Sequence, residues 1–445
     1  MRTYAEAGDR SYSHHLWVYI FDFTVCTYGT PVLKNLDYWP PLPLVVNYGG
    51  FPTLPPPSPE DEDNIMAALE QSDRVRSINL TVSGSLLRKL STISKPLSEL
   101  EDVVLLSQDS VQLILPSAFW WGHRLRTLHS TKVAFPSLPQ LLFPSQDLVD
   151  LQLNEIPGVG YFPPESFANA LCGMTRLQTL SLHFLSFPPR RNYLSLPPLP
   201  GDRVVLPSLN RFKYRGISKY LDTLVARIDA PRLRDIDVRF FGQPFLDTSQ
   251  LGLFINRIEI LRSPLQAEIL SFGGAISITF THPKARIRLG LRISCEPLDW
   301  QLSSISQICD YFSCFLTCVT DLGITTIGPS NVPDDMDEKL WLRLISAFGG
   351  AIDFRVASEL ATDILRALRP ADEEHKTVLP ALRILHVQVP MSMHGPLWDS
   401  VESFVTQRQL SGHPVHLSYG PTVEEVASAK RWVDEQRKTA FNHST

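Results

Sequence analysis

The chain has few cysteines, and the six are not spaced like a disulfide framework in 445 residues. So few thiols in so long a chain are typical of free, buried cysteines in a reducing compartment. Cys314 and Cys318 are close enough to share a helix face with Cys309 nearby. Zinc needs four ligands, however, and no histidine lies near them in the sequence. The sequence therefore predicts neither disulfides nor a metal site.

Motifs of catalysis and phosphate binding are also missing. The sequence contains no G-x-S-x-G, G-x-x-x-x-G-K-[ST], G-x-G-x-x-G or H-E-x-x-H. The histidines between His386 and His416 have no spacing that fixes a shared geometry. The acidic run Asp334–Glu338 lacks the alternating ligands and the glycine of a calcium loop. We therefore expect no catalytic residue and no cofactor, and we expect that the protein is not an enzyme.

A long hydrophobic run and a basic stripe are absent as well. The apolar run Leu16–Tyr28 contains Asp22 and is shorter than the roughly 20 residues that cross a bilayer. It also comes too late for a convincing signal peptide. The formal net charge is −5, which does not favour binding to phosphates. These features predict no membrane and no nucleic-acid partner, and a location in the cytoplasm or nucleus.

Prolines are abundant, with 36 in the chain, and they cluster between short apolar runs, which indicates many short elements. Residues 1–64 are predicted to be an irregular segment rich in proline and aromatic residues, ending in a linker. Within them, Pro43–Asn47 is predicted to be a strand. The acidic run Glu60–Asp63 is expected to lie at the N-terminus of a helix that begins near Asn64, where negative charge is favourable.

Further along the chain, a six-residue pattern recurs with apolar side chains at positions one, four and six. The first residues of successive copies between Leu125 and Leu233 are 23, 29, 32 and 24 residues apart. Leucine-rich repeats have roughly this period of 20–29 residues and an L-x-x-L-x-L strand. The longest step contains the proline-rich insertion Phe187–Pro200. The copies are Leu125–Ser130, Leu148–Leu153, Leu177–Leu182, Leu209–Tyr214, Leu233–Val238 and a late one at Leu382–Val387.

Positions four and six of each strand are expected to point into one core, while the segments between strands have helical spacing. One such unit cannot bury its apolar side alone, whereas stacked units can. The predicted fold is an α/β, irregular leucine-rich-repeat solenoid over residues 65–445, with a curved parallel sheet and with helices and loops on the convex side. A charged helix at Thr422–Lys438 is expected to cap it.

After Val238 the leucine signature fades, but strand-like and helix-like segments still alternate. Strands are predicted at 275–281, 287–294, 319–326, 351–356 and 414–419. Helices are predicted at 301–315, 339–348, 359–368 and 397–408.

The outward residues of the repeat strands should form rows on the concave face of the sheet. Each such residue, taken alone, has a competing interpretation as a merely solvated side chain. Together, rows of mixed charge and hydroxyl groups are typical of a protein-binding surface. The predicted binding residues are Thr127, His129, Asp150, Gln152, Thr179, Ser181, Arg211, Lys213, Asp235 and Asp237.

Several stretches resemble basidiomycete fungal F-box proteins with leucine-rich repeats, and the resemblance extends over most of the chain. It is carried by Trp39–Val46, Pro59–Asp63, Asp73–Leu80, Leu125–His129 and Tyr214–Gly216. The resemblance implies the substrate receptor of an SCF-type ubiquitin ligase. In that arrangement an F-box binds the Skp adaptor and thus the cullin, and the repeats select the protein to be ubiquitylated.

The sequence departs from this family at its N-terminus. Residues 1–38 show no leucine-proline opening of an F-box, and Trp17–Phe23 is too short and too aromatic to serve as one. Either the motif was lost or the chain is a truncated product. The competing hypothesis is therefore a leucine-rich-repeat adaptor or scaffold with no ubiquitin role. The bound protein itself is not predicted.

Overall fold

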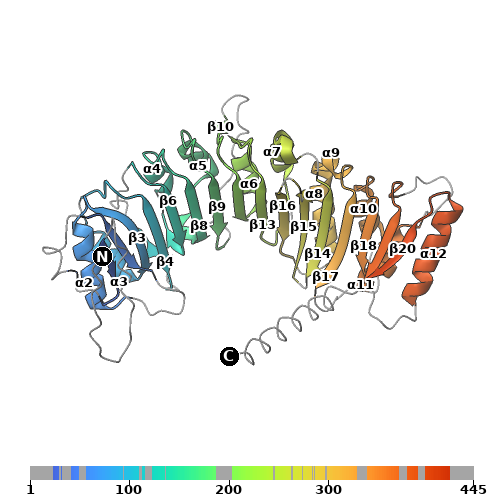
Figure 1. Ribbon diagram of the computed structural model, residues 1–445, viewed down its shortest axis with the longest axis horizontal. Coiled ribbons are helices and arrows are strands. Elements are labelled where there is room, and N and C mark those ends of the chain that lie inside the picture. The colour runs from blue at the N-terminus through green and yellow to red at the C-terminus, as the bar shows by residue number, and fades with distance from the viewer. Residues whose placement is uncertain are drawn as a thin grey trace, which may run out of the picture. The chain divides into compact units, whose positions relative to one another are not determined.

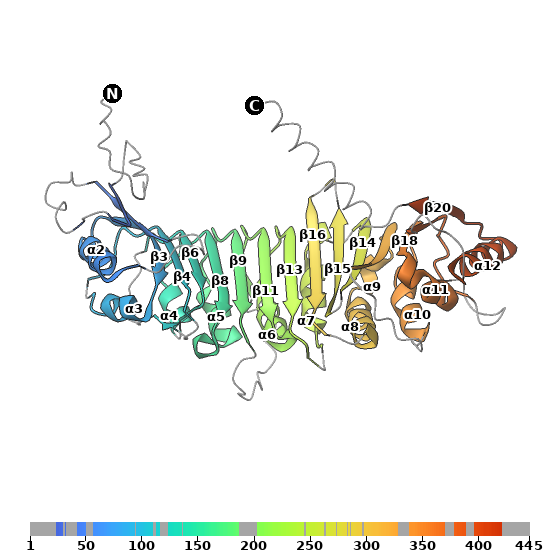
Figure 2. The same cartoon turned by 90° about the horizontal axis from the view of Figure 1, so that it is seen from below.

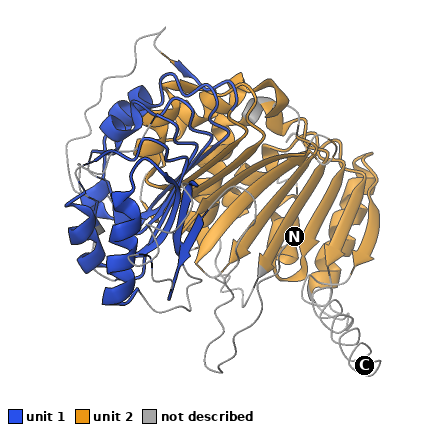
Figure 3. Cartoon of the chain, turned by 60° about the vertical axis from the view of Figure 1, so that its left-hand side comes forward, with its two compact units in different colours: residues 1–193, 204–208 blue, residues 194–203, 209–445 orange. Residues whose placement is uncertain are grey.

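The computed structural model describes residues 24–29, 32, 42–49, 57–93, 95–109, 113–115, 123–135, 137–186, 203–243, 246–261, 264–272, 274–282, 284, 286–295, 298–327, 338–369, 378–388 and 396–420. The chain divides into two compact units (Figure 3). Unit 1 comprises residues 1–193 and 204–208, and unit 2 comprises residues 194–203 and 209–445. The predicted boundary at residue 64 falls inside unit 1. The predicted capping helix at Thr422–Lys438 lies outside the described residues.

Unit 1 is built on a parallel sheet in which strands follow one another in chain order (Figure 1). Its strands are β1 (Thr24–Thr27), β2 (Leu44–Tyr48), β3 (Val75–Val82), β4 (Asp102–Ser107), β6 (Thr127–Thr131), β8 (Asp150–Ile156) and β9 (Thr179–Phe184). The short strands β5 (Leu113–Ile114) and β7 (Val133–Ala134) form a separate parallel pair, and β10 spans Val204–Val205. The helices are α2 (Pro59–Glu70), α3 (Gly84–Leu90), α4 (Leu138–Leu142), α5 (Pro164–Ala170) and the 3₁₀ turn η1 (Gly158–Gly160).

Unit 2 has a mostly parallel sheet with the order β11-β13-β16-β15-β14-β17-β18-β19-β20. Its strands are β11 (Arg211–Gly216), β12 (Ile228–Asp229), β13 (Asp235–Phe240), β14 (Gln266–Phe272), β15 (Ala275–His282), β16 (Ile287–Ile293), β17 (Asp321–Ile327), β18 (Asp353–Ala357), β19 (Ile384–Gln388) and β20 (His416–Gly420). Its helices are α6 (Ser218–Val225), α7 (Ser249–Arg257), α8 (Leu298–Tyr311), α9 (Ser313–Leu316), α10 (Glu338–Ser346), α11 (Ser358–Ala367), α12 (Pro396–Leu410) and the 3₁₀ turn η2 (Glu259–Leu261).

The buried face of each sheet is built from the predicted apolar positions. In the repeat of β8, the first, fourth and sixth residues are Leu148, Leu151 and Leu153, which are 0–2% exposed. The repeat of β13 buries Leu233, Ile236 and Val238 completely. Burial of one such side chain contributes roughly 1.5–3 kcal/mol. The α/β alternation with a mainly parallel sheet is therefore confirmed, and so is the role of these positions in the core.

The strands share a repeated hydrogen bond at their starts. The carbonyl of Arg126 accepts the N–H groups of both Val149 and Asp150, at 2.8 and 3.0 Å. The carbonyl of Thr320 likewise accepts those of Ile352 and Asp353. One carbonyl thus fixes the next strand at two successive residues. This bond pattern explains why the register is the same from repeat to repeat.

Burial of the first, fourth and sixth residues of a repeat also occurs in segments that lack the leucine pattern. Val75, Ile78 and Leu80 on the β3 segment are fully buried. In unit 2, the β18 segment buries the fourth and sixth residues Phe354 and Val356 in the same manner, with Ala351 first. Valine, phenylalanine and alanine fill the core here, so the pattern persists although the leucines do not.

The prediction of a purely parallel sheet is wrong between β13 and β17. Strands β14, β15 and β16 form an antiparallel meander, and β16 rather than β14 is the parallel neighbour of β13. β14 in turn pairs in parallel with β17. The turns between these strands are too short to hold a helix, so consecutive strands must pair antiparallel.

The helix predicted near Asn64 begins earlier, at Pro59. Ser58 caps it, because its hydroxyl accepts the Asp61 N–H while the Asp61 carboxylate accepts the Ser58 N–H, which is a capping box. Glu60, Asp61 and Glu62 occupy the first turn, where the helix dipole favours negative charge. The acidic run is thus part of the helix. The strand predicted at Pro43–Asn47 is β2, one residue later, and it pairs with β3.

Helices cover one side of the sheet within each unit (Figure 2). Adjacent helices also contact one another, as in α2 with α3, α6 with α7, and α10 with α11. Among the described helices, none combines the length and apolar character needed to cross a bilayer.

Candidate protein-binding face

The side of each sheet opposite the helices presents alternate strand residues, because successive side chains point to opposite faces. We call this side the helix-free face of each unit (Figure 2). The ten residues predicted from the sequence lie at the alternate positions between the buried ones, six on unit 1 and four on unit 2.

On unit 1, the six predicted residues form two rows across β6, β8 and β9. Strand pairing aligns Thr127 with Asp150 and Asp150 with Thr179. The next row runs from His129 through Gln152 to Ser181. Five of the six are partly exposed, but Ser181 is only 2% exposed, so its availability as a contact residue is a wrong prediction. Its short side chain lies below its neighbours, with its hydroxyl 3.4 Å from His183 Nε2.

His129, Asp150 and Gln152 are joined in one network. His129 Nε2 lies 2.9 Å from Asp150 Oδ2, and the Gln152 amide nitrogen donates to both carboxylate oxygens at 3.1 Å. The hydrogen bonds of the aspartate therefore connect the two rows. This arrangement presents a fixed polar surface suited to hydrogen bonding with a partner.

The rows of unit 1 extend onto strands that lack the leucine signature. Asn47 on β2 aligns with Asn79 on β3, and their side-chain amides bond at 3.0 Å. Asn79 then aligns with Val104 on β4, which aligns with His129. The alternation of polar and apolar residues in Arg74–Val82 is the sequence signal that could have revealed Asn79 as an outward residue.

On unit 2, the four predicted residues form two matched pairs of opposite charge. Arg211 aligns with Asp235, and Arg211 Nε lies 3.0 Å from Asp235 Oδ2. Lys213 aligns with Asp237, which also receives Arg239 Nη2 at 2.9 Å. Arg211 is exposed, and the other three residues are partly exposed.

Four arginines on the same face were missed by sequence reasoning. Arg215 and Arg239 stand at the seventh positions of their repeats, one place beyond the six-residue pattern. Arg288 and Arg292 lie on β16, next to β13 in the sheet. Because the meander was not expected, nothing in the sequence placed β16 beside the repeat strands.

Farther along the helix-free face of unit 2, charged residues again meet across strands. Asp353 Oδ2 lies 3.2 Å from His386 Nε2, and Glu268 Oε2 lies 3.7 Å from Arg355. Burial raises the pKa of Glu268, although Arg355 and Thr325 oppose that rise. A Cβ on Gly323 would stand 2.2 Å from Glu268 Oε2, so the glycine makes room for this carboxylate.

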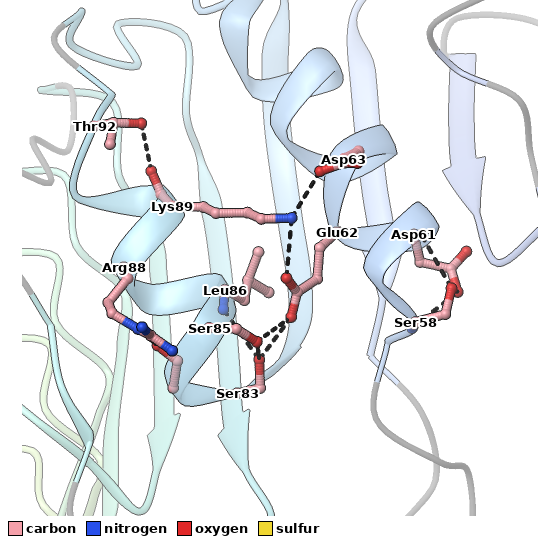
Figure 4. A network of polar contacts seen from close by, with 11 residues as sticks. Ser58, Asp61, Glu62, Asp63, Ser83, Ser85, Leu86, Arg88, Lys89 and Thr92 are labelled. Carbon is pink, nitrogen blue, oxygen red and sulfur yellow. Dashed lines mark hydrogen bonds and ion pairs between the residues drawn. The ribbon is translucent and has the colours of Figure 1, made fainter.

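A further polar cluster joins α2 to α3 (Figure 4). Glu62 accepts hydrogen bonds from Ser83 at 2.9 Å and from Ser85 at 2.5 Å, and it pairs with Lys89 at 3.2 Å. Lys89 also contacts Asp63 at 2.7 Å. Because Glu62 is only 4% exposed, the cluster fastens two helices together and offers no accessible ligand site.

Among the described residues, the candidate cysteine and histidine ligands do not come together. Within the part of the chain that the structure describes, no three His, Cys, Asp or Glu side chains form a group able to hold a metal ion. Cys309 is buried and Cys318 is exposed, while the side chain of Cys314 and all of His394 lie outside the described set. His386 aligns with Ser418, and His416 aligns with Ile384, so the two histidines occupy different rows.

Comparisons with known proteins leave the family unassigned. No protein-family model matches the chain, and no curated protein matches it. A solved structure similar to it is the complex of TLR13 with the RNA ssRNA13, at 11% identity and a TM-score of 0.29. The alignment covers 78% of this chain and 46% of that one, so the chain spans less than half of that protein's length. A likeness this low supports no inference about fold or function.

Proposed function

We propose that the protein is a leucine-rich-repeat solenoid that binds another protein on its helix-free face. The observation that carries this proposal is the alignment of polar side chains in rows across neighbouring strands. The rows Thr127–Asp150–Thr179 in unit 1 and Arg211–Asp235–Arg288 in unit 2 each hold their side chains in one register. Such a rigid array positions hydrogen-bonding groups at low entropic cost.

The more specific proposal is that this recognition serves an SCF-type ubiquitin ligase. It is supported by the resemblance of Trp39–Val46, Pro59–Asp63 and Asp73–Leu80 to fungal F-box proteins. The repeats would select the substrate protein, and the chemistry would belong to partners reached through the Skp adaptor and cullin. No residue of this chain is then catalytic, and no cofactor, nucleic acid or membrane is required.

The recognition proposal is tested by capture with matched variants. The tagged chain is crosslinked in a basidiomycete cell extract, and the proteins recovered are identified by mass spectrometry. The face variant combines Thr127→Arg with Lys213→Glu. Its control combines Thr92→Arg with Lys219→Glu, which makes the same changes at exposed positions outside the helix-free face. We expect a partner that the control retains and the face variant loses.

Equal recovery with both variants would refute the helix-free face as the binding surface. The same experiment tests the ligase proposal separately. Recovery of a Skp adaptor and a cullin supports it, whereas their absence, with a face-dependent partner still present, leaves an adaptor or scaffold without a ubiquitin role.

A further inference from the structure

The helix-free face of unit 2 is strongly basic over three adjacent strands. The side chains that β11, β13 and β16 present there include six cations and two carboxylates, a formal net charge of +4 in a chain whose total is −5. We call this set the basic patch. It consists of Arg211, Lys213, Arg215, Asp235, Asp237, Arg239, Arg288 and Arg292.

The two carboxylates of the basic patch already have partners. Asp235 pairs with Arg211 at 3.0 Å and Asp237 pairs with Arg239 at 2.9 Å. For the four remaining cations, Lys213, Arg215, Arg288 and Arg292, the described residues provide no carboxylate within ion-pair distance. Among the described residues, the patch therefore holds positive charge without a paired carboxylate.

Three of the arginines stand side by side at one level of the sheet. Arg215 aligns with Arg239, and Arg239 aligns with Arg292. Neighbouring strands are about 4.8 Å apart, and like charges directly opposite one another destabilise a sheet. Asp237 offsets the charge of the central Arg239, so the charge that a bound anion would offset is that of the two outer guanidinium groups, Arg215 and Arg292.

Aromatic rings hold the two outer guanidinium groups of this row. Arg292 lies over the Phe272 ring at 4.6 Å, and Arg215 lies over the Phe241 ring at 5.8 Å. Such stacking is favourable and restricts the side chain without using its hydrogen-bond donors. The guanidinium N–H groups therefore remain available to a carboxylate, which arginine can bind in a bidentate manner.

Gly290 leaves a position without a side chain inside the basic patch. It lies between Arg288 and Arg292 on β16 and aligns with Asp237. A Cβ built there would be in ordinary van der Waals contact, with Arg288 Nη2 and Asp237 Oδ1 each at 3.9 Å. A small side chain would thus fit, but Gly290 is buried among its neighbours, so a large side chain there would displace Arg288 and Asp237.

The extent of the patch favours a short acidic peptide over a nucleic acid. Glu268, Asp321 and Asp353, on β14, β17 and β18, occupy the same rows farther along the sheet, so a long polyanion would meet repulsion there. The Phe241 and Phe272 rings are only partly exposed and lie under the arginines. They therefore offer no open surface on which bases could stack.

We propose that the basic patch binds an extended, glutamate- or aspartate-rich segment of the partner protein, with its carboxylates on Arg215 and Arg292, the two outer arginines of the row. This inference rests on the proposed function and specifies the chemistry of the partner. Alternate side chains of an extended peptide lie on the same side, roughly 6.6 Å apart. The strands that carry the arginines are roughly 4.8 Å apart, and the long arginine side chains can spread to meet the wider spacing.

The test measures fluorescence anisotropy with a labelled peptide of alternating Glu and Thr. The same peptide with Gln in place of Glu and a single-stranded RNA of equal charge are compared with it. The patch variant is Arg215→Gln/Arg292→Gln, and its control is Arg343→Gln/Arg366→Gln on α10 and α11, which removes the same charge from exposed helices. Far-UV circular dichroism confirms that each variant is folded.

We expect the Glu peptide to bind, the patch variant to weaken that binding at least about tenfold, and the control to change it less than about twofold. Gly290→Leu changes no charge and is expected to weaken binding about threefold or more, because the larger side chain displaces Arg288 and Asp237. The inference is overturned by equal binding of the Gln peptide, by equal effects of patch variant and control, or by tighter binding of the RNA.

The outcome separates this inference from the proposed function. A peptide that fails to bind, alongside a captured partner that the face variant loses and the control retains, would refute only the acidic ligand. If the face variant and its control capture partners equally while the Glu peptide still binds specifically, only the proposed scaffold role is refuted.

Discussion

On β6, β8 and β9 the helix-free face of unit 1 carries threonine, glutamine and histidine with one aspartate, whereas β11, β13 and β16 of unit 2 carry six cations and two carboxylates. Beneath these faces the buried positions are alike. Leu151 in unit 1 and Ile236 in unit 2 occupy the same fourth position and are fully buried. The core therefore fixes the repeat, and the opposite face is free to vary.

The largest expected effect tests the shared core. Leu151→Ala and Ile236→Ala should each lower the free energy of unfolding by about 2–5 kcal/mol, because each leaves a cavity in a packed layer. Urea unfolding followed by circular dichroism measures both. Thr127→Ala and Lys213→Ala serve as controls from the helix-free face and should change stability by less than about 0.5 kcal/mol. If either core variant lowers the free energy of unfolding by less than about 1 kcal/mol, the conclusion that both units share the same kind of core is contradicted.

The next comparison concerns two buried carboxylates, one in each unit. Burial is the largest influence on Glu62 and raises its pKa, but bonds from Ser85, Ser83 and Lys89 outweigh it and leave the pKa lowered. In unit 2, burial raises the pKa of Asp222 to about 6, against the opposing N–H bonds of Leu251 and Gln250. The contributions of these two carboxylates to stability should therefore depend on pH in opposite senses.

For Glu62, the lowered pKa means that its stabilising contribution is present above its ordinary value of 4.5 and is lost as the pH falls. Glu62→Gln should cost about 1–3 kcal/mol at pH 7, and the difference from the parent should shrink in acid. Asp63→Asn is the matched control, since Asp63 shares Lys89 but is 62% exposed at its side chain. Chemical unfolding across the acid range measures both variants, and a cost that is independent of pH would refute the ionic role.

For Asp222, the raised pKa means that its contribution is present below 3.8 and is lost as the pH rises through about 6. The parent should lose about 1–2 kcal/mol of stability over this window, allowing for partial solvent screening. In Asp222→Asn the amide oxygen can still accept the Leu251 N–H, which the carboxylate accepts at 2.9 Å, and this loss should disappear. An unchanged pH slope in the variant would show that another group is responsible.

The sequence predicts the repeats best where each copy begins with leucine. From Leu148 to Val238, every strand begins at the third position of its copy of the pattern. At Val319, Leu322 and Ile324, burial is equally complete, yet mixed apolar types hide the repeat. The core requires only apolar side chains of suitable size. The fold therefore persists where the leucine pattern is lost, although the repeat can then no longer be recognised in the sequence.

The candidate site was less predictable than the core. Ser181 follows the outward pattern but is buried, because alternation fixes the direction of a side chain and not its exposure. Arg292 joins Arg239 only through the pairing of β16 with β13. That pairing depends on how a meander folds back into the sheet, and local periodicity does not encode it.

The smallest expected effect concerns the ion pair between Arg211 and Asp235 on the face of unit 2. Arg211 is about half exposed, so solvent screens its 3.0 Å contact with Asp235, and exposed pairs contribute only about 0–1 kcal/mol. Arg211→Gln should therefore change the free energy of unfolding by less than about 0.5 kcal/mol, similar to Thr127→Ala on the face of unit 1. Urea unfolding measures both variants side by side. A loss above about 1 kcal/mol would show that the charges of unit 2 maintain the fold. A negligible loss would instead leave recognition as the reason that this face of unit 2 carries many more charges than that of unit 1.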